Sequence, residues 1–464
     1  MVEPLWTSAQ IADATHGEAV GPPFAATGIS IDTRTLEPGD LFVALAGVRD
    51  GHEFVDQALA KGAAGVLVSR PTPGPAVRVG DVQSALERLG LAGRERARGV
   101  RRGAVTGSVG KTSLTQAIAA GLAKAGPSHA SVKSYNNHIG VPLTLARMPR
   151  GTERAIFEIG MNHAGEITPL ARMVAPQAVA ITNVGPAHIE NFADGEAGIA
   201  RAKAEIFLGL TPGGVAVLKA DDRWFGLLRG RAKDAGAEVL TFGSGADADA
   251  RLDGFEIDHG MVVRAALHGR PLEIRLRQTG AHWGLMSLAA LLMLEALDVS
   301  LGEALAALAA FEPLEGRGAT RPIRTAKGCF TLVDESYNAN PISVGSALAT
   351  LGAKPARGRR IVALTDMLEL GAQSAVMHRA LAEPIALAGV DLVFCAGPMM
   401  KALFDALPPT RRGGYATDAQ ALAPELVRAI EPGDVVMVKG SRDSRAKDLV
   451  QALAALEVPA EDAR

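Results

Sequence analysis

Cysteine is scarce in this chain of 464 residues, since Cys329 and Cys395 are the only two. Both lie in apolar stretches, GCFTLV and LVFCAG, where a thiol usually behaves as a small buried hydrophobe. The two positions therefore predict buried structural thiols rather than a disulfide or a metal-binding pair.

Long hydrophobic runs are also missing. The longest apolar stretches, such as residues 287–297, fall well short of the roughly 20 residues that cross a bilayer. The N-terminal segment has no basic start followed by an apolar run, and Asp13 and Glu18 interrupt its helical pattern. We therefore expect no export, no stable membrane insertion and a cytoplasmic location.

A strong net charge is absent as well. Lysine and arginine number 48 against 50 aspartate and glutamate, which leaves −2, and no long basic run occurs. The surface as a whole is therefore not suited to nucleic acid or to an anionic membrane, and a local site must hold any anionic ligand. The 48% apolar and 21% charged content is ordinary for a globular protein.

The chain length and the order of its patterns predict an α/β protein with three domains. Residues 1–100 predict a small α/β domain, and the Arg-rich residues 94–102 at its end are expected to be a turn or linker. Residues 101–315 alternate strands with helices, which predicts a mostly parallel sheet with an antiparallel extension at residues 252–277. Residues 316–464 restart the alternation and predict a Rossmann-like, doubly wound domain.

The clearest motif is TGSVGKT at residues 106–112, between a strand predicted to end at Val105 and a helix predicted to begin at Thr112. Such a loop offers backbone N–H groups, a lysine and a helix N-terminus to phosphate. Lys111 is expected to reach the β- and γ-phosphates, and the Thr112 hydroxyl to bind Mg²⁺. The full P-loop pattern has glycine where this chain has Val105. The ATP-binding candidates in the loop are Gly107, Ser108, Val109, Gly110, Lys111, Thr112 and Ser113.

The loop without its first glycine resembles the ATP loop of the Mur ligases and of their folylpolyglutamate synthase relatives. Further segments resemble landmarks of the Mur ligase family in the same order: YNNHIGVPLTL, FEIGMNHAGEI, ITNVGPAHIENF, AKAEIF, DESYNANP, TDMLELG and VKGSR. DESYNANP followed by DMLELG resembles the branch that adds D-alanyl-D-alanine, rather than the branches that add L-Ala, D-Glu or the third residue.

The resemblance implies an ATP-dependent amide ligase with Mg²⁺ that works through an acyl phosphate. Its substrates would be UDP-N-acetylmuramoyl (UDP-MurNAc)-tripeptide and D-Ala-D-Ala, and its product the pentapeptide precursor of peptidoglycan, on which cell-wall biogenesis, cell shape and cell division depend. We expect a monomer. The sequence leaves open whether the third peptide residue is meso-diaminopimelate or lysine.

Three residues outside the loop are implied to act in catalysis and metal binding. Glu158 ends the apolar strand AIFEIG, where a carboxylate at the sheet edge can bind Mg²⁺, although a loop-edge charge is the alternative. The resemblance implies that His188 helps to hold a second Mg²⁺ and that Lys203 forms a carbamate with CO₂; a core histidine and a helix-surface lysine are the alternatives. A carbamate needs the neutral amine, whose ordinary pKa is about 10.4. The expected catalytic set is Lys111, Glu158, His188 and Lys203, and the expected metal ligands are Thr112, Glu158, His188 and Lys203 as a carbamate.

Further nucleotide contacts are implied by the resemblance. Arg317 lies at the expected hinge between the second and third domains, and Asn338, together with Tyr337, is expected to approach ATP from the third domain. His282 keeps its motif position in GAHWGLMSLAA, but Met286 stands where the family often has an asparagine that contacts adenine. We therefore expect backbone groups and apolar packing to hold the base.

The segments IDTRTLEPGDLFVAL and DGHEFVDQA resemble the uridine-nucleotide domain of the family. They supply candidates for the UDP end of the substrate, and a solvated loop is the alternative for each. Asn136 and Asn137 are expected to place the pyrophosphate or the sugar. The full set is Thr33, Arg34, Asp50, Gly51, His52, Asn136 and Asn137.

Other functions fit parts of the pattern. Another Mur ligase, or a ligase like folylpolyglutamate synthase, would use the same loop and the same acyl phosphate. A P-loop kinase or a GTPase-like switch would bind the nucleotide without forming an amide. A non-catalytic nucleotide-binding module is disfavoured, because Glu158, His188 and Lys203 share one domain with Lys111 and Thr112.

Overall fold

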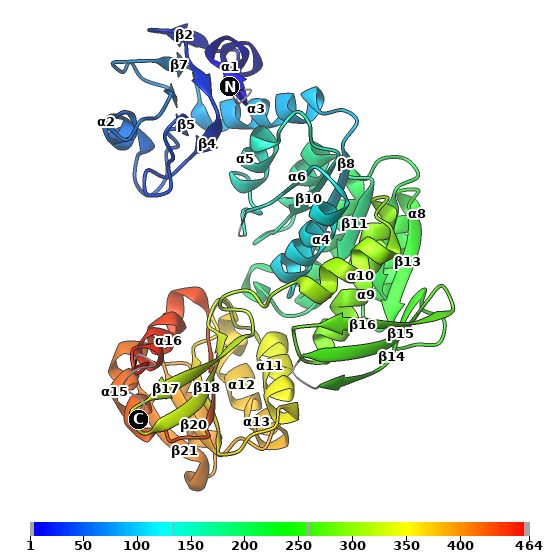
Figure 1. Cartoon of the computed structure of the whole chain (residues 1–464), viewed down its shortest axis with the longest axis vertical. Coiled ribbons are helices and arrows are strands. Elements are labelled where there is room, and N and C mark those ends of the chain that lie inside the picture. Colours follow the sequence, from blue (N-terminus) through cyan, green and yellow to red (C-terminus); the bar gives the residue numbers. More distant parts are fainter. Residues whose placement is uncertain (1–3, 133, 258–259, 459–464) are drawn as a thin grey trace.

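The computed structural model describes residues 4–132, 134–257 and 260–458. Three α/β bodies follow one another along the chain, and the central body joins the other two (Figure 1). This arrangement confirms the predicted fold class. Among the helices of the described residues, none has the length and apolar content needed to span a bilayer.

The N-terminal body is built on a five-stranded sheet in the order β2-β7-β6-β5-β4, which is parallel except where β2 meets β7. Its strands are β2 (Glu18–Val20), β4 (Gly28–Ser30), β5 (Asp40–Val43), β6 (Gly65–Val68) and β7 (Ala76–Arg78), with a separate pair β1 (Trp6–Thr7) and β3 (Ala25–Ala26). Its helices are α1 (Ser8–Thr15), α2 (Val55–Ala60) and α3 (Val82–Arg96).

The expectation that residues 94–102 form a turn or linker was wrong in part, because α3 continues to Arg96 and the next strand begins at Arg101. The reason lies in Arg96, whose guanidinium stacks 3.8 Å from the centre of the Trp6 ring. It also donates hydrogen bonds to the carbonyls of Leu5 and Met148 at 2.6 Å each. An arginine that looks like linker material in the sequence is thus part of a packed seam.

This seam joins the N-terminal body to the central one through α3 and α5 (Gly140–Arg147). Gly93 allows the two backbones to meet, because a Cβ there would lie 2.4 Å from the carbonyl oxygen of Leu145. The Trp6 indole donates to the Ala146 carbonyl at 2.8 Å, and Arg147 Nε donates to the Ile29 carbonyl at 2.7 Å. The two bodies are therefore held by close backbone packing and by hydrogen bonds between them.

The central body has a nine-stranded sheet in the order β16-β15-β14-β13-β12-β11-β8-β10-β9. Neighbouring strands are parallel through the stretch β14-β13-β12-β11-β8-β10-β9 of this sheet. The pairs β14–β15 and β15–β16 are antiparallel, which confirms the predicted extension. The strands are β8 (Arg101–Thr106), β9 (Ser128–Ala130), β10 (Arg154–Glu158), β11 (Ala178–Ile181), β12 (Val215–Lys219), β13 (Glu238–Gly243), β14 (Ala250–Ile257), β15 (Met261–Leu267) and β16 (Arg270–Leu276).

Helices cover both faces of the central sheet. One core gathers apolar side chains of α4 (Lys111–Ala125) and α9 (Ala281–Ala296), and the opposite core those of α6 (Ile167–Val174), α7 (Glu196–Ala204) and α8 (Phe225–Asp234). α10 (Leu301–Ala310) packs against α4. Strand β8 lies between β10 and β11, so the loop that follows it opens at the carboxyl edge in the middle of the parallel strands, where α/β sheets bind ligands.

The C-terminal body has a six-stranded sheet in the order β17-β18-β22-β19-β20-β21, in which only the pair β17–β18 is antiparallel. Its strands are β17 (Ala319–Thr325), β18 (Gly328–Glu335), β19 (Arg360–Thr365), β20 (Leu392–Ala396), β21 (Arg412–Ala416) and β22 (Val435–Lys439). Its helices are α11 (Pro341–Ala353), α12 (Ser374–Ala380), α13 (Ala382–Leu387), α14 (Lys401–Ala406), α15 (Ala419–Ala429) and α16 (Ala446–Ala454).

The two cysteines, both in this body, differ in burial. Cys395 is fully buried in β20, as predicted, and burial raises the pKa of its thiol to about 12. The prediction for Cys329 was wrong, because this residue is exposed. Successive strand side chains point to opposite faces, so the buried Phe330 and Leu332 mark the inner face of β18 and Cys329 points outward.

Candidate active site

The phosphate-binding loop runs between β8 and α4, whose ends differ by one residue each from the predicted strand end and helix start. Val105 is a buried residue inside β8, where it pairs with Glu158 on one side and Ala180 on the other. Gly107 is needed after the strand, because a Cβ there would lie 1.8 Å from the Thr182 hydroxyl oxygen. The turn therefore starts later than in the full P-loop pattern, and the strand occupies the place of the first glycine.

Lys111 folds back over this loop, where its Nζ donates to the Gly107 carbonyl at 2.8 Å. Burial lowers the pKa of the Lys111 ammonium, and Glu158 opposes that shift while Arg317 adds to it. Among the described residues, the half-buried ammonium has the Gly107 carbonyl as its hydrogen-bond partner, so it would gain from an anion that enters the loop.

A cavity of about 490 Å³ opens above the loop, between the central and C-terminal bodies. The central body contributes the loop, the end of β10 and the start of α9, and the C-terminal body contributes residues around β18, α11 and β22. Twelve of the expected residues line this cavity: Ser108, Val109, Gly110, Lys111, Thr112, Ser113, Asn136, Glu158, His282, Arg317, Tyr337 and Asn338.

Glu158 is a buried carboxylate in this cavity and is suited to bind a metal ion. It ends β10 with only 1% of its surface exposed, and its Oε1 accepts a 2.6 Å hydrogen bond from Asn136 Nδ2. Its Oε2 is buried and has no hydrogen-bond partner among the described residues. A buried carboxylate oxygen without a donor is costly, and a hard cation beside Thr112 is a group that would satisfy it.

Lys203 lies on α7 with 2% of its surface exposed, so it is not a helix-surface lysine. In the described part of the chain its amine makes no hydrogen bond and no ion pair. Burial lowers the pKa of this amine well below its ordinary value, and the nearby Lys111 adds to the effect. The neutral form that reacts with CO₂ is therefore favoured by burial itself.

His188 follows β11 at a left-handed backbone angle, φ 58°. Its Nδ1 lies 2.5 Å from Oε2 of Glu369, a residue of the C-terminal body that is also left-handed, with φ 63°. The His188 contact lowers the pKa of the Glu369 carboxyl. Neither His188 nor Lys203 lines the cavity, and nowhere in residues 4–132, 134–257 and 260–458 do three His, Cys, Asp or Glu side chains gather as a ready metal site. Of the expected metal ligands, Thr112 and Glu158 line the cavity, and phosphate oxygens of a bound nucleotide would add further oxygen ligands.

Arg317 reaches from the C-terminal body into the phosphate loop, where its Nη2 donates to the Thr112 hydroxyl at 3.1 Å. The guanidinium carbon lies 4.1 Å from the centre of the Tyr337 ring. The Tyr337 hydroxyl forms a short hydrogen bond with that of Ser134 in the central body. The two bodies therefore touch through polar contacts at the cavity itself.

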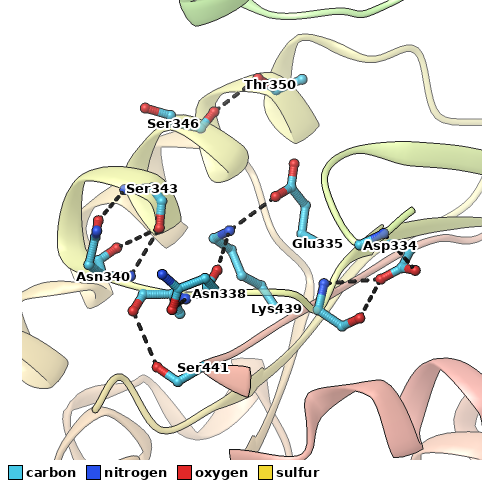
Figure 2. Close-up of polar contacts among 12 residues, drawn as sticks. Asp334, Glu335, Asn338, Asn340, Ser343, Ser346, Thr350, Lys439 and Ser441 are labelled. Carbon is cyan, nitrogen blue, oxygen red and sulfur yellow. Dashed lines mark hydrogen bonds and ion pairs between the residues drawn. The ribbon is translucent and has the colours of Figure 1, made fainter. Parts of the chain in front are cut away.

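A lysine that we did not predict lies in the wall of the cavity. Lys439 ends β22 beside Glu335 at the end of β18, and its buried ammonium donates to Glu335 Oε2 at 3.0 Å and to the Asn338 carbonyl at 3.1 Å (Figure 2). Ser441 donates to the Ala339 carbonyl and so ties the same two loops together. The motif VKGSR contains this lysine, but only the pairing of β18 with β22 shows its partner.

The expected adenine region is apolar on the side of α9. Met286 lies over the loop, since its Sδ would be 3.0 Å from a Cβ at Gly110, and Trp283, Leu285 and Ala289 line the same side of the cavity. His282 is half-buried, and desolvation lowers the pKa of its imidazole.

The expected UDP residues do not line the described cavity, with the exception of Asn136. His52 accepts a hydrogen bond from the Ser69 backbone N–H at Nε2 (3.0 Å) and contacts Asp50 through Nδ1 (2.7 Å). The hydrogen bonds from the ring and the backbone N–H of His52, together with the charge of Arg70, lower the pKa of Asp50 to about 2. Thr33 donates to Gln57, and Asn137 accepts from the backbone of Gly140 at 2.9 Å.

These side chains thus brace their own loops. Gly51 has a local reason too, because a Cβ there would lie 2.6 Å from the Leu45 carbonyl oxygen. Arg34 differs from the other candidates, since its side chain is 87% exposed beside Asp32.

Family models of Mur ligases match three stretches of the chain. Residues 25–89 match the model described as the Mur ligase family catalytic domain, residues 105–294 the Mur ligase middle domain, and residues 321–442 the Mur ligase glutamate ligase domain.

Several relatives match this chain over nearly their whole length. The UDP-N-acetylmuramoyl-tripeptide–D-alanyl-D-alanine ligase of Escherichia coli K12 is 35% identical over 96% of this chain and 98% of its own. The ligase of that name from Bacillus subtilis is 31% identical over 96% of this chain and 98% of its own. A crystal structure of MurF from Acinetobacter baumannii superposes with a TM-score of 0.84 and 29% identity over 98% of this chain and 99% of its own.

Proposed function

The chain belongs to the Mur ligase family, and from this membership we propose that it joins D-Ala-D-Ala to UDP-MurNAc-tripeptide at the expense of ATP. One observation carries the proposal within the molecule: the half-buried Lys111, the unsatisfied oxygen of Glu158 and the Arg317 guanidinium meet in one cavity between two bodies. The full-length identity with ligases of that name supports the choice of substrates.

The chemistry requires activation of a carboxylate, because an unactivated carboxylate oxygen is a poor leaving group. The terminal carboxylate of the tripeptide attacks the γ-phosphorus of ATP, the bond from phosphorus to the bridging oxygen breaks, and ADP leaves. Lys111 and Arg317 offset the negative charge that the transferring phosphoryl group carries. Mg²⁺ bound by the Thr112 hydroxyl and Glu158 would supply further positive charge at the same place.

The second step forms the amide. The amine of D-Ala-D-Ala attacks the acyl carbon, loses its proton, and phosphate leaves. An α-amino group has a pKa near 8, so about a fifth is neutral at pH 7.4 and no strongly perturbed base is required. Positioning between the two bodies and exclusion of water therefore dominate this step.

Lys203 and His188 complete the proposed metal site. The buried and unpaired Lys203 amine adds to CO₂, loses a proton and becomes a carbamate, which replaces an amine by an anionic oxygen ligand. His188 would contribute from the turn after β11. We further propose that Arg34 and Asn136 meet the UDP end of the precursor, and that Asp50, Gly51, His52, Thr33 and Asn137 shape the loops around it.

ATP and nucleotide-linked precursors are substrates of the cytoplasm, where we place the reaction, with a monomer as the working unit. A pentapeptide precursor made there would serve peptidoglycan synthesis, and through it cell shape and division. ATP, rather than another nucleoside triphosphate, is proposed on the family membership, because Met286 offers adenine an apolar surface and no amide.

The test is an ADP-release assay with UDP-MurNAc-tripeptide, run with and without D-Ala-D-Ala, and with Lys111→Met as the inactive control. We expect release that depends on both substrates, together with a product of pentapeptide mass. Amide formation with L-Ala, D-Glu or a folate instead would identify a sibling ligase. Nucleotide hydrolysis without a new amide would contradict the proposal and favour a kinase or a switch.

A further inference from the structure

Tyr337 contacts both walls of the cavity, and we infer that it is a positioning residue that couples the nucleotide site to the loop of residues 134–137. The inference rests on the proposed function, because it concerns the binding of ATP and of the UDP precursor.

The ring of Tyr337 positions Arg317. The guanidinium carbon lies 4.1 Å from the ring centre while Nη2 reaches the Thr112 hydroxyl at 3.1 Å, so the stacked guanidinium points at the phosphate loop. The backbone fixes this arrangement, because the Tyr337 N–H donates to the Gly316 carbonyl at 3.1 Å. Gly316 has φ 72°, and a Cβ there would lie 3.0 Å from that of Tyr337. The backbone of Gly316 and Tyr337 therefore keeps the ring beside the guanidinium of Arg317, which follows Gly316.

The hydroxyl of Tyr337 reaches the other wall. It forms a short hydrogen bond with the Ser134 hydroxyl, which lies 203 residues away in the sequence and in the central body. Two residues after Ser134, Asn136 donates to Glu158 Oε1 at 2.6 Å. The loop that meets Tyr337 is therefore the loop that meets the proposed metal ligand.

A nucleotide that engages Arg317 must act on this loop through Tyr337. When the phosphates hold the guanidinium, the stacked ring is held too, and its hydroxyl restrains Ser134 and the residues that follow. The UDP precursor then loses less conformational entropy when it orders the 134–137 loop. The nucleotide and the precursor therefore each tighten the binding of the other. Loss of the hydroxyl removes the coupling, and loss of the ring also weakens the nucleotide site.

The test is a double-mutant cycle read by calorimetry on the full chain. The dissociation constant of UDP-MurNAc-tripeptide is measured with and without the β,γ-imido analogue of ATP, for the unmodified protein and for Tyr337→Phe, Ser134→Ala and their combination. Each single change should reduce the coupling factor about three- to tenfold, and the double change should reduce it no further. Tyr415→Phe is the matched control, since that hydroxyl binds the Gly397 carbonyl in the C-terminal body, away from the cavity.

A second measurement follows the binding of the ATP analogue in the absence of the UDP precursor. Tyr337→Leu, which keeps an apolar side chain but removes the ring, should weaken binding of the ATP analogue about three- to tenfold, and by more than Tyr337→Phe, which keeps the ring. Multiplicative losses in the double variant, or unaltered analogue binding by Tyr337→Leu, would overturn the inference while leaving ligase activity of the unmodified protein as support for the proposed function. No binding of the precursor by the unmodified protein would overturn both.

Discussion

Replacement of Lys203 by methionine should raise the stability of the protein and abolish its activity. The Lys203 amine is buried and without a hydrogen bond or an ion pair in the described structure, so it contributes a desolvation cost that no contact offsets. A buried polar group without a partner costs about 1–3 kcal/mol, and methionine fills a similar volume without that group. We expect Lys203→Met to unfold at a higher temperature by about 2–4 °C per kcal/mol in a unit the size of the central body.

The pH dependence has a definite sign. The pKa of Lys203 is lowered in the folded protein from 10.5, so between the folded pKa and 10.5 the unfolded chain binds more protons than the folded one. Stability of the unmodified protein therefore rises with pH across that window, relative to Lys203→Met. The advantage of the variant should be largest near neutral pH and vanish as the pH approaches 10.5.

The assays are chemical unfolding at several pH values in CO₂-free buffer without Mg²⁺, and ADP release with bicarbonate present. Lys203→Met should be at least as stable as the unmodified protein and should lose acceptor-dependent ADP release by several orders of magnitude. A variant destabilised by more than about 2 kcal/mol would mean that the amine makes a favourable interaction, and the argument from its isolation would fail. Full activity in the variant would refute the carbamate.

Two further changes test the seam and the adenine surface. Gly93→Ala should destabilise the protein by about 1–3 kcal/mol in thermal unfolding, because its Cβ would lie 2.4 Å from the Leu145 carbonyl oxygen. Gly230 in α8 is the control, because a Cβ there would meet nothing within 4 Å; Gly230→Ala should stabilise the protein by up to about 1 kcal/mol through helix propensity. If Gly93→Ala and Gly230→Ala changed the stability equally, the tight packing at the seam would be contradicted. Met286→Asn should leave the KM for ATP within about threefold, because we expect apolar packing and backbone groups to hold the base; a large gain in ATP affinity would show that a missing amide contact matters.

Features with a local cause could be read from the sequence. The loop at residues 106–112 combines small residues, a lysine and a flanking strand and helix, all within one short segment, and the structure has that arrangement. The alternation of strands and helices predicted the three α/β bodies for the same reason. Even Glu158 could be placed at a sheet edge, because it ends an apolar strand.

Features that depend on distant partners could not be read in this way. Ser134 and Tyr337, His188 and Glu369, and Arg317 and Thr112 meet only because the C-terminal body lies against the central one. Burial was misjudged at Cys329 because apolar neighbours in a strand do not say which face a side chain takes.

The residues proposed to bind the UDP end were also hard to judge from the sequence. Polar residues that brace a loop and polar residues that bind a ligand have the same composition, and hydrogen bonds such as Ser69 to His52 appear only in three dimensions.

The central claim is that this cavity activates a carboxylate as an acyl phosphate, and isotope transfer tests it most directly. UDP-MurNAc-tripeptide labelled with ¹⁸O in its terminal carboxylate is incubated with ATP, Mg²⁺ and D-Ala-D-Ala, and the released phosphate is analysed by mass spectrometry. We expect one ¹⁸O atom in each phosphate, in step with pentapeptide formation, and no labelled phosphate with Lys111→Met. Phosphate released without ¹⁸O while the pentapeptide forms would contradict the central claim.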